Sequence, residues 1–253
     1  MGKILAFANQ KGGVGKTTSA VNTAAALGKK GKKVLMVDLD PQGNCTSGVG
    51  IGKKSIKKST YEVLIGECTA RDAILETEFK NLSIMPSTMA LAGAEFELGE
   101  IEHRENCLKN ALATVIEDYD YIVIDCPPSL SQLTVNALTA ANGLIIPMQC
   151  EFYALEGLSQ LMMTVKRVRQ LYNPTLEITG ILLTMYNGRL ILSNQVVAEL
   201  KKYYAEKIFK TAISRGVKLS EAPGFGKPIC YYDPFGKGAQ EYAEVAKELI
   251  LRI

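Results

Sequence analysis

Short apolar runs alternate with longer amphipathic segments along almost the whole chain. The apolar runs have the length of buried strands and fall at Ile4–Asn9, Val34–Asp38, Leu82–Pro86, Tyr121–Asp125, Gly143–Met148 and Ile178–Thr184. The amphipathic segments have helical spacing and fall at Thr17–Lys30, Arg104–Glu117, Ser131–Ala141, Leu155–Leu171, Ser193–Lys207 and Ala239–Leu251. Strands that are apolar throughout, each followed by a helix, predict an α/β fold with a mostly parallel, twisted sheet and helices on both faces.

Nothing in the sequence divides this pattern into separate units. The 253 residues are 47% hydrophobic and 22% charged and include 9 prolines, which is the composition of a folded chain rather than a disordered one. The sequence contains no linker rich in glycine, serine and proline and no internal repeat, so we expect a single domain over residues 1–253. The least regular segment, 43–60, contains four lysines, and we expect an exposed loop there.

Composition also limits the location and the chemistry of the protein. No stretch is apolar enough for a transmembrane helix, and the first ten residues have no features of a signal peptide. The six cysteines are scattered without a CxxC pair, which argues against a disulfide framework or a structural zinc site and favours the reducing cytoplasm. The one histidine, His103, lies in a charged segment that predicts a solvated helix face, so a histidine-rich metal site is excluded.

A glycine-rich turn between the first strand and the first helix predicts a nucleotide-binding site. Glycines let the backbone bend so that several N–H groups converge on phosphate oxygens, and the N-terminus of the following helix adds its positive end. Lys16 is placed to reach the β- and γ-phosphates, and the Thr17 hydroxyl is placed to bind Mg²⁺. The turn residues that we expect to contact the nucleotide are Gly12, Gly13, Val14, Gly15, Lys16, Thr17 and Thr18.

The turn departs from the ordinary G-x-x-x-x-G-K-[ST] motif. Gln10 stands where that motif has its first glycine, and a second lysine, Lys11, precedes two glycines. This KGGVGKTT sequence resembles the deviant Walker A family of P-loop NTPases, which includes the ParA/Soj partition ATPases, MinD and the nitrogenase iron protein. The resemblance implies a P-loop NTPase fold in which Lys11 contacts the nucleotide of the other subunit across a dimer interface. A cation there would neutralise charge that develops during phosphoryl transfer, as an arginine finger does.

Three aspartates follow two of the predicted strands. Asp38 and Asp40 stand at the end of the second strand, and Asp125 ends the fourth. Because ligands bind at the carboxyl ends of parallel strands, we expect all three aspartates to lie near the glycine-rich turn, residues 10–18, which we call the phosphate loop. Mg²⁺ is held by one or two carboxylates together with phosphate oxygens, so we expect Asp125 to hold the metal and Asp38 to support Lys16 and the metal's waters. In the family that the chain resembles, the residue at Asp40 orients the attacking water. The expected catalytic residues are Lys11, Lys16 and Asp40.

Four further blocks extend the resemblance over essentially the whole chain. They are DLDPQGN at 38–44, DCPPSL at 125–130, QCEFYALEGLSQL at 149–161 and LSEAPGFGKPI at 219–229, and they are similar to chromosomal ParA proteins of the Soj type. The resemblance implies an ATPase that uses ATP and Mg²⁺, forms a homodimer with ATP, coats double-stranded DNA without sequence preference and is stimulated by a ParB (Spo0J) partner. Such a protein is cytoplasmic and associates with the nucleoid. The segment 149–161 would lie near the dimer interface.

The resemblance also assigns base-binding residues. Adenine contacts in this family come from the region of Met185–Asn187 and from the loop Ser214–Gly216. Relatives usually have Pro-Arg-Asn in that loop, and this chain has Ser-Arg-Gly. Backbone contacts from Ser214 and Gly216 survive this change, whereas a contact from a side-chain amide does not.

The C-terminal part of the chain is basic. Residues 1–159 contain 15 basic against 18 acidic residues, and residues 160–253 contain 14 against 8. In Soj-type proteins the arginines that match Arg189 and Arg215 contact DNA phosphates. A third position of this kind is commonly arginine in those proteins, and Lys218 keeps its positive charge here. Phosphate contacts supply affinity without sequence information, which fits non-specific binding. The alternative interpretation of the same charges is a solvated surface without an anionic partner.

Three other functions of related nucleotide-binding proteins fit this sequence less well than partitioning. A MinD-like membrane ATPase needs a C-terminal amphipathic helix with a basic face, whereas 239–253 contains three glutamates and two basic residues, so we expect no membrane contact. A reductase like the nitrogenase iron protein needs two cysteines placed to share a cluster, and Cys126 and Cys150 lack the pattern that surrounds those. A nucleotide-binding scaffold without hydrolysis would lack Asp40 or Lys16, and both are present.

Overall fold

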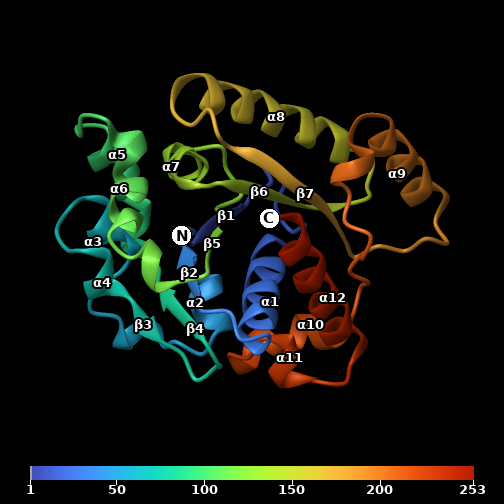
Figure 1. Ribbon diagram of the computed structural model, residues 1–253, viewed down its shortest axis with the longest axis horizontal. Coiled ribbons are helices and arrows are strands. Elements are labelled where there is room, and N and C mark those ends of the chain that lie inside the picture. Colours follow the sequence, from blue (N-terminus) through green and yellow to red (C-terminus); the bar gives the residue numbers. More distant parts are fainter. Residues whose placement is uncertain (1) are drawn as a thin grey trace.

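One seven-stranded sheet forms the centre of the computed structural model, which describes residues 2–253 (Figure 1). The strand order is β3-β4-β2-β5-β1-β6-β7, and only the edge pair β3–β4 is antiparallel. The strands are β1 (Lys3–Phe7), β2 (Val34–Asp38), β3 (Leu75–Glu76), β4 (Leu82–Met85), β5 (Tyr121–Asp125), β6 (Gly143–Gln149) and β7 (Glu177–Thr184). All six predicted strands are present; β3, with two residues, is too short to give a hydrophobic period.

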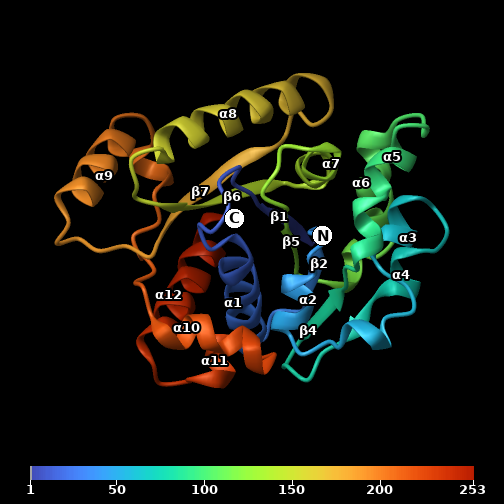
Figure 2. The same ribbon diagram turned by 180° about the vertical axis from the view of Figure 1, so that it is seen from behind.

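Helices cover both faces of the sheet, as Figures 1 and 2 show. The longer ones are α1 (Lys16–Lys29), α7 (Gln132–Ala140), α8 (Ala154–Leu171), α9 (Ile191–Tyr204) and α12 (Lys237–Arg252). The shorter ones are α2 (Asn44–Gly48), α3 (Thr60–Leu64), α4 (Ala70–Ala73), α5 (Ala94–Leu98), α6 (Cys107–Ala113), α10 (Val217–Glu221) and α11 (Ile229–Tyr232). The predicted α/β class is therefore confirmed. Within residues 2–253, no helix combines the length and the apolar content that a membrane crossing requires.

Side chains along β1 show why these strands are apolar throughout. Ile4 and Ala6 belong to the core on the side of α7 and α8, whereas Leu5 and Phe7 pack on the opposite side with α1 and α12. Successive side chains of a strand point to opposite faces, so a strand between two helical layers buries every position. This double burial fixes β1 at the centre of the sheet, and the phosphate loop follows directly from its end.

The segment 104–117 is less helical than its pattern predicts. Only α6 is α-helical there, and 3₁₀ turns at Arg104–Asn106 and Ile116–Asp118 flank it. The Thr114 hydroxyl donates a hydrogen bond to the Ala111 carbonyl at 2.7 Å, and the next two residues are β-branched. Both features favour the end of a helix. His103, just before this segment, is exposed as predicted, with 77% of its side chain accessible, but it lies in a turn with a φ of 55° and not on a helix face.

The prediction of an exposed loop at 43–60 holds for its four lysines but is wrong at both ends. The first residues form α2, in which Cys45 and Thr46 are completely buried, and at the far end Ser59 and Thr60 are buried where α3 begins. The Asp38 carboxylate accepts hydrogen bonds from the Thr46 backbone N–H at 2.8 Å and from its hydroxyl at 2.6 Å. A buried carboxylate at the end of β2 thus draws the following turn against the sheet, and this tertiary contact leaves no hydrophobic pattern in the sequence.

Candidate nucleotide-binding site

The phosphate loop lies at the carboxyl end of β1 and leads into α1. Gly13 and Gly15 have φ angles of 73° and 81°, in the left-handed region that glycine enters without strain. Gly15 is also the N-cap of α1, so the free N–H groups of the first helical turn adjoin the loop. The Thr184 hydroxyl at the end of β7 donates to the Val14 carbonyl at 2.7 Å. The loop is therefore shaped by glycine and held by the sheet, as an anion-binding turn requires.

The two lysines of the loop have different surroundings. Lys16 is buried, and its Nζ donates to the Lys11 carbonyl at 2.9 Å. Burial lowers the pKa of Lys16, and the Asp125 carboxylate acts in the opposite direction. The Lys11 ammonium instead forms an ion pair with Glu151, which lies between β6 and α8, and both side chains are partly exposed. Lys16 thus lies within its own loop, whereas the Lys11 side chain is directed to the segment near the expected dimer interface.

Asp125 is the most unusual carboxylate of the chain. It is completely buried at the end of β5, in register with Asp38 on the neighbouring strand β2, and neither of its oxygens has a hydrogen-bond partner among residues 2–253. Burial and then the charge of Asp38 raise the pKa of Asp125 well above its ordinary value, whereas the Thr17 hydroxyl and the Lys16 ammonium act to lower it. A buried carboxylate without partners is costly unless a cation compensates it. Asp125 and Thr17 therefore fit Mg²⁺, which prefers oxygen ligands.

Asp38 and Asp40 hold the turn that follows β2. Asp38 accepts its two hydrogen bonds from Thr46 and a third from the Asp40 N–H at 3.2 Å. Burial raises the pKa of Asp38 to about 6, and the hydrogen bonds from Thr46 oppose the rise. Asp40 is 8% exposed, and its Oδ1 accepts from the Gln42 N–H at 2.9 Å. Asp38 is thus the anchor of the turn that carries Asp40, and the metal role expected for Asp38 stays a prediction.

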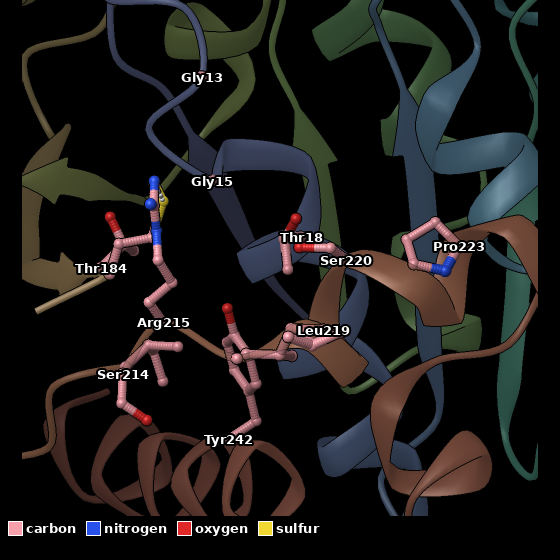
Figure 3. A pocket seen from close by; sticks show the side chains of 14 residues that line it. Gly13, Gly15, Thr18, Thr184, Ser214, Arg215, Leu219, Ser220, Pro223 and Tyr242 are labelled. Atoms are coloured by element: carbon pink, nitrogen blue, oxygen red, sulfur yellow. Dashed lines mark hydrogen bonds between the residues drawn. The ribbon is translucent and has the colours of Figure 1, made fainter.

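A pocket of about 500 Å³ adjoins the phosphate loop (Figure 3). Thr18 lines one side of it. Met185, Ser214 and Gly216 line the opposite end, where the resemblance leads us to expect the adenine base, and we call this the base end. Tyr242 of α12 also lines it, with its hydroxyl 3.2 Å from the Ser19 hydroxyl of α1. The structure thus brings the predicted base loop beside the predicted phosphate loop, in a space that continues from one to the other.

Comparisons with known proteins agree with this geometry. A family model for an AAA domain matches residues 2–178. The chain is 54% identical over 249 residues to the sporulation initiation inhibitor protein Soj of Bacillus subtilis, and the match covers 98% of each chain. It is 48% identical over 252 residues to the chromosome partitioning protein ParA of Caulobacter vibrioides, covering 99% of this chain and 94% of that one. The chain belongs to the Soj/ParA family of chromosome-partitioning ATPases.

A solved structure shares the Soj/ParA fold over nearly the whole chain. The Mycobacterium smegmatis protein called cobyrinic acid a,c-diamide synthase, crystallised with ADP and magnesium, is 38% identical to this chain. Its TM-score is 0.87, and the match covers 99% of this chain and 94% of that one. The expected P-loop NTPase fold is thereby confirmed.

The other residues expected from the Soj/ParA resemblance have distinct surroundings. Asn187 does not line the pocket; it is exposed, and its Oδ1 accepts from the N–H of Arg189, which is also exposed. Arg215 lines the pocket, and its Nη2 lies 3.9 Å from the sulfur of Met185 (Figure 3). Lys218 pairs with Glu221 at 3.2 Å. The DNA-contacting roles of these three cations stay predictions.

The sequence did not predict several residues that contact the loops of the Soj/ParA site and support their positions. Thr184 ends a predicted strand at the same edge as the aspartates, so its position was a usable signal. Glu151 lies in the QCEFYALEGLSQL block, but nothing in that block marks it as the partner of Lys11. Glu241 and Tyr242 lie in α12, more than 220 residues after the phosphate loop, and only the tertiary fold brings them to the pocket.

Proposed function

We propose that this chain is an ATP-driven partition protein. It binds ATP with Mg²⁺, dimerises in the ATP-bound state, binds double-stranded DNA without sequence preference, and hydrolyses ATP when a ParB-type partner stimulates it. The observation that carries the proposal is the contrast between the two lysines. Lys16 is enclosed by its own phosphate loop, whereas the Lys11 ammonium pairs with the partly exposed Glu151 and is available to a second subunit.

Within one subunit, the chain's own groups bind and orient the nucleotide. The loop N–H groups and the N-terminus of α1 bind phosphate oxygens, and Lys16 neutralises charge at the β- and γ-phosphates. Asp125 and Thr17 would hold Mg²⁺, which shields the phosphate charge during transfer. Asp40, fixed by its bond from Gln42, orients the attacking water.

Lys11 and Gly12 support a dimer interface on the phosphate-loop face. Gly12 is exposed, its φ is not positive, and a Cβ built there would meet nothing within 4 Å. The fold of one subunit therefore does not require glycine at this position. Close approach of a second phosphate loop supplies the requirement, and that approach brings Lys11 to the partner's phosphates.

The test of the proposal is ATP-dependent dimerisation of wild type and Gly12→Val, measured by sedimentation velocity. Wild type should be a monomer with ADP and a dimer with a slowly hydrolysed ATP analogue. Gly12→Val should bind ATP as wild type does, because a Cβ at this position meets nothing within 4 Å in the subunit, yet stay a monomer. A Gly12→Val protein that dimerises normally would refute this interface.

DNA binding follows from dimerisation in this proposal. The chain has few candidate DNA contacts in each subunit, namely Arg189, Arg215 and Lys218, too few for tight binding by a monomer. A dimer presents twice that number on one body, so ATP raises DNA affinity through avidity.

The packing of α12 favours this function over that of a MinD-like membrane ATPase. A membrane-binding amphipathic helix needs a free apolar face. The apolar face of α12, with Tyr242, Val245, Ala246 and Leu249, is buried in the core that it shares with α1. Figures 1 and 2 show the two helices side by side.

A further inference from the structure

Glu241, in the second turn of α12, holds the loop at the base end of the pocket. Its carboxylate accepts two hydrogen bonds from one residue, from the Ser214 N–H at 3.0 Å and from the Ser214 hydroxyl at 2.8 Å. Its side chain is only 12% exposed, and Lys237, one turn earlier, lies 3.6 Å from it. Two bonds to one residue fix both the position and the orientation of that residue, and hydrogen bonds to a charged acceptor are stronger than neutral ones.

The rest of the loop shows why this anchor matters. On its first side the loop is tied to β7, because the Ile213 N–H donates to the Leu183 carbonyl at 2.8 Å and the Ile213 carbonyl accepts from the Tyr186 N–H at 2.9 Å. Ser214 also forms a parallel bridge with Tyr186, and the next two residues, Arg215 and Gly216, line the pocket. Glu241 therefore holds the loop from the side of α12, directly before the two residues at the base end of the pocket.

The neighbouring residue connects the same helix to the phosphate loop. Tyr242 lines the pocket, and its hydroxyl lies 3.2 Å from Ser19 on α1. Figure 3 shows the Ser214 side chain directed to α12 and the Tyr242 ring directed into the pocket. Consecutive residues of α12 thus join the base loop and the phosphate-loop helix, and the distance between the two ends of the nucleotide is set by one rigid element.

Purine recognition makes the position of this loop decisive. Adenine presents an amino donor beside a ring-nitrogen acceptor, whereas guanine presents a carbonyl acceptor beside a ring N–H donor, in the opposite order. Backbone N–H and C=O groups at a fixed position can match only one of these edges, and the unmatched base leaves buried polar groups unpaired. A loop that can shift loses this discrimination, because it can satisfy either base.

We propose that Glu241 is a positioning residue for base recognition: through Ser214 it fixes the backbone of residues 214–216 so that the pocket selects adenine over guanine nucleotides. The inference rests on the nucleotide pocket of the proposed function and is independent of dimerisation and DNA binding. Glu241 itself touches neither base nor phosphate in this account.

The experiment is calorimetric binding of ATP, GTP and inorganic tripolyphosphate, each with Mg²⁺, to Glu241→Gln. Because the amide keeps the size of the carboxylate but places an NH₂ against a donor, we expect about tenfold weaker ATP binding and a similar loss in the ATP-to-GTP affinity ratio. Tripolyphosphate has no base, so its affinity should stay within about twofold of wild type. Ser214→Ala, which removes one bond of the two, should lower the ratio by about threefold.

Glu244→Gln is the matched control, because Glu244 lies on the same helix and, within residues 2–253, its ion pair is with the exposed Lys247. It should leave all three affinities unchanged. An unchanged ATP-to-GTP ratio in Glu241→Gln and Ser214→Ala would overturn the proposal, and so would an equal loss of ATP and tripolyphosphate binding, since that would mean general damage to the fold. If wild type binds ATP and GTP equally, base selection is refuted and the proposed function is not affected. If wild type binds neither nucleotide, the proposed function itself is refuted.

Discussion

Lys11 and Glu151 form an ion pair although 140 positions separate them in the sequence. The pair joins the phosphate loop to the segment between β6 and α8. Both side chains are partly exposed, at 33% and 45%, and such pairs contribute about 0–1 kcal/mol. The pair therefore gives the Lys11 side chain a defined position in the single subunit. Because the pair is weak, Lys11 can leave Glu151 easily when the bound nucleotide of a second subunit approaches.

Replacing Lys11 tests its role across the interface. Lys11→Ala should bind ATP with nearly wild-type affinity, because its ammonium does not line its own loop, but should hydrolyse ATP at least about 100-fold more slowly, in the range that a charge-stabilising group supplies. Hydrolysis is measured by phosphate release at saturating ATP. Glu151→Gln is the control: it breaks the same pair but keeps the lysine, and it should change the dimer dissociation constant by no more than about fivefold. Equal loss of hydrolysis in both variants would contradict a role for Lys11 itself.

Asp40 and Lys16 should fail at different steps. Asp40→Ala loses the carboxylate that we propose to orient water but keeps the phosphate loop, so it should accumulate as an ATP-bound dimer with hydrolysis reduced by about 100-fold or more. Lys16→Ala loses the cation within the loop and should lose productive ATP binding. Size-exclusion chromatography with bound-nucleotide analysis separates the two results. Wild-type turnover by Asp40→Ala would show that the assignment of Asp40 is wrong.

Asp125→Asn should stabilise the nucleotide-free protein while it abolishes Mg²⁺-dependent hydrolysis. The raised pKa means that the folded state binds the Asp125 proton more tightly than the unfolded state does, so wild-type stability falls as pH rises above the ordinary value of an aspartate. We expect a Tm about 2–4 °C above wild type near pH ~7.5, with a difference that shrinks toward pH ~5. Asp118→Asn, at an exposed ion pair, is the control and should leave Tm unchanged. A lower Tm for Asp125→Asn at every pH would contradict the buried-charge argument.

The Arg189 side chain should contribute to DNA affinity and not to dimerisation. Arg189→Glu should weaken DNA binding about tenfold or more, nearly independently of DNA sequence, while the ATP-dependent dimer persists. Fluorescence anisotropy over a salt series measures this, and the salt dependence should become less steep. Lys109→Glu, an equal charge reversal at an exposed position of α6, should have little effect. Unchanged DNA affinity in Arg189→Glu would contradict the proposal that the basic C-terminal part binds DNA through Arg189.

The sequence predicts those parts of the fold that have a local pattern. Strands that are buried on both faces, such as β5, are continuously apolar, and the turn from Lys11 to Lys16 combines glycines with lysines in an order that has few other uses. The position of Asp125 at the end of β5, beside Asp38, could be predicted because Asp125 ends a predicted strand. These features are encoded by residues close together in the chain.

The parts that the sequence does not predict depend on contacts between distant residues. Helix α2 forms against the sheet because Asp38 binds Thr46, and its residues have no helical period of their own. The loop at Ser214 is held by Glu241 on α12, and neither residue type marks a nucleotide site. Arg215 lines the pocket in this structure, a position that charge counting does not distinguish from an outer surface.

If ATP controls DNA affinity through dimerisation, the nucleotide state should set how tightly the protein binds DNA, which is measured with ADP, with ATP and with a slowly hydrolysed ATP analogue. The same duplex and salt concentration are used for wild type and for Gly12→Val. We expect binding at least about tenfold tighter with the analogue than with ADP for wild type, and weak binding with every nucleotide for Gly12→Val. Equal affinity of wild type with ADP and with the analogue, or nucleotide-dependent binding by a monomeric Gly12→Val protein, would contradict it.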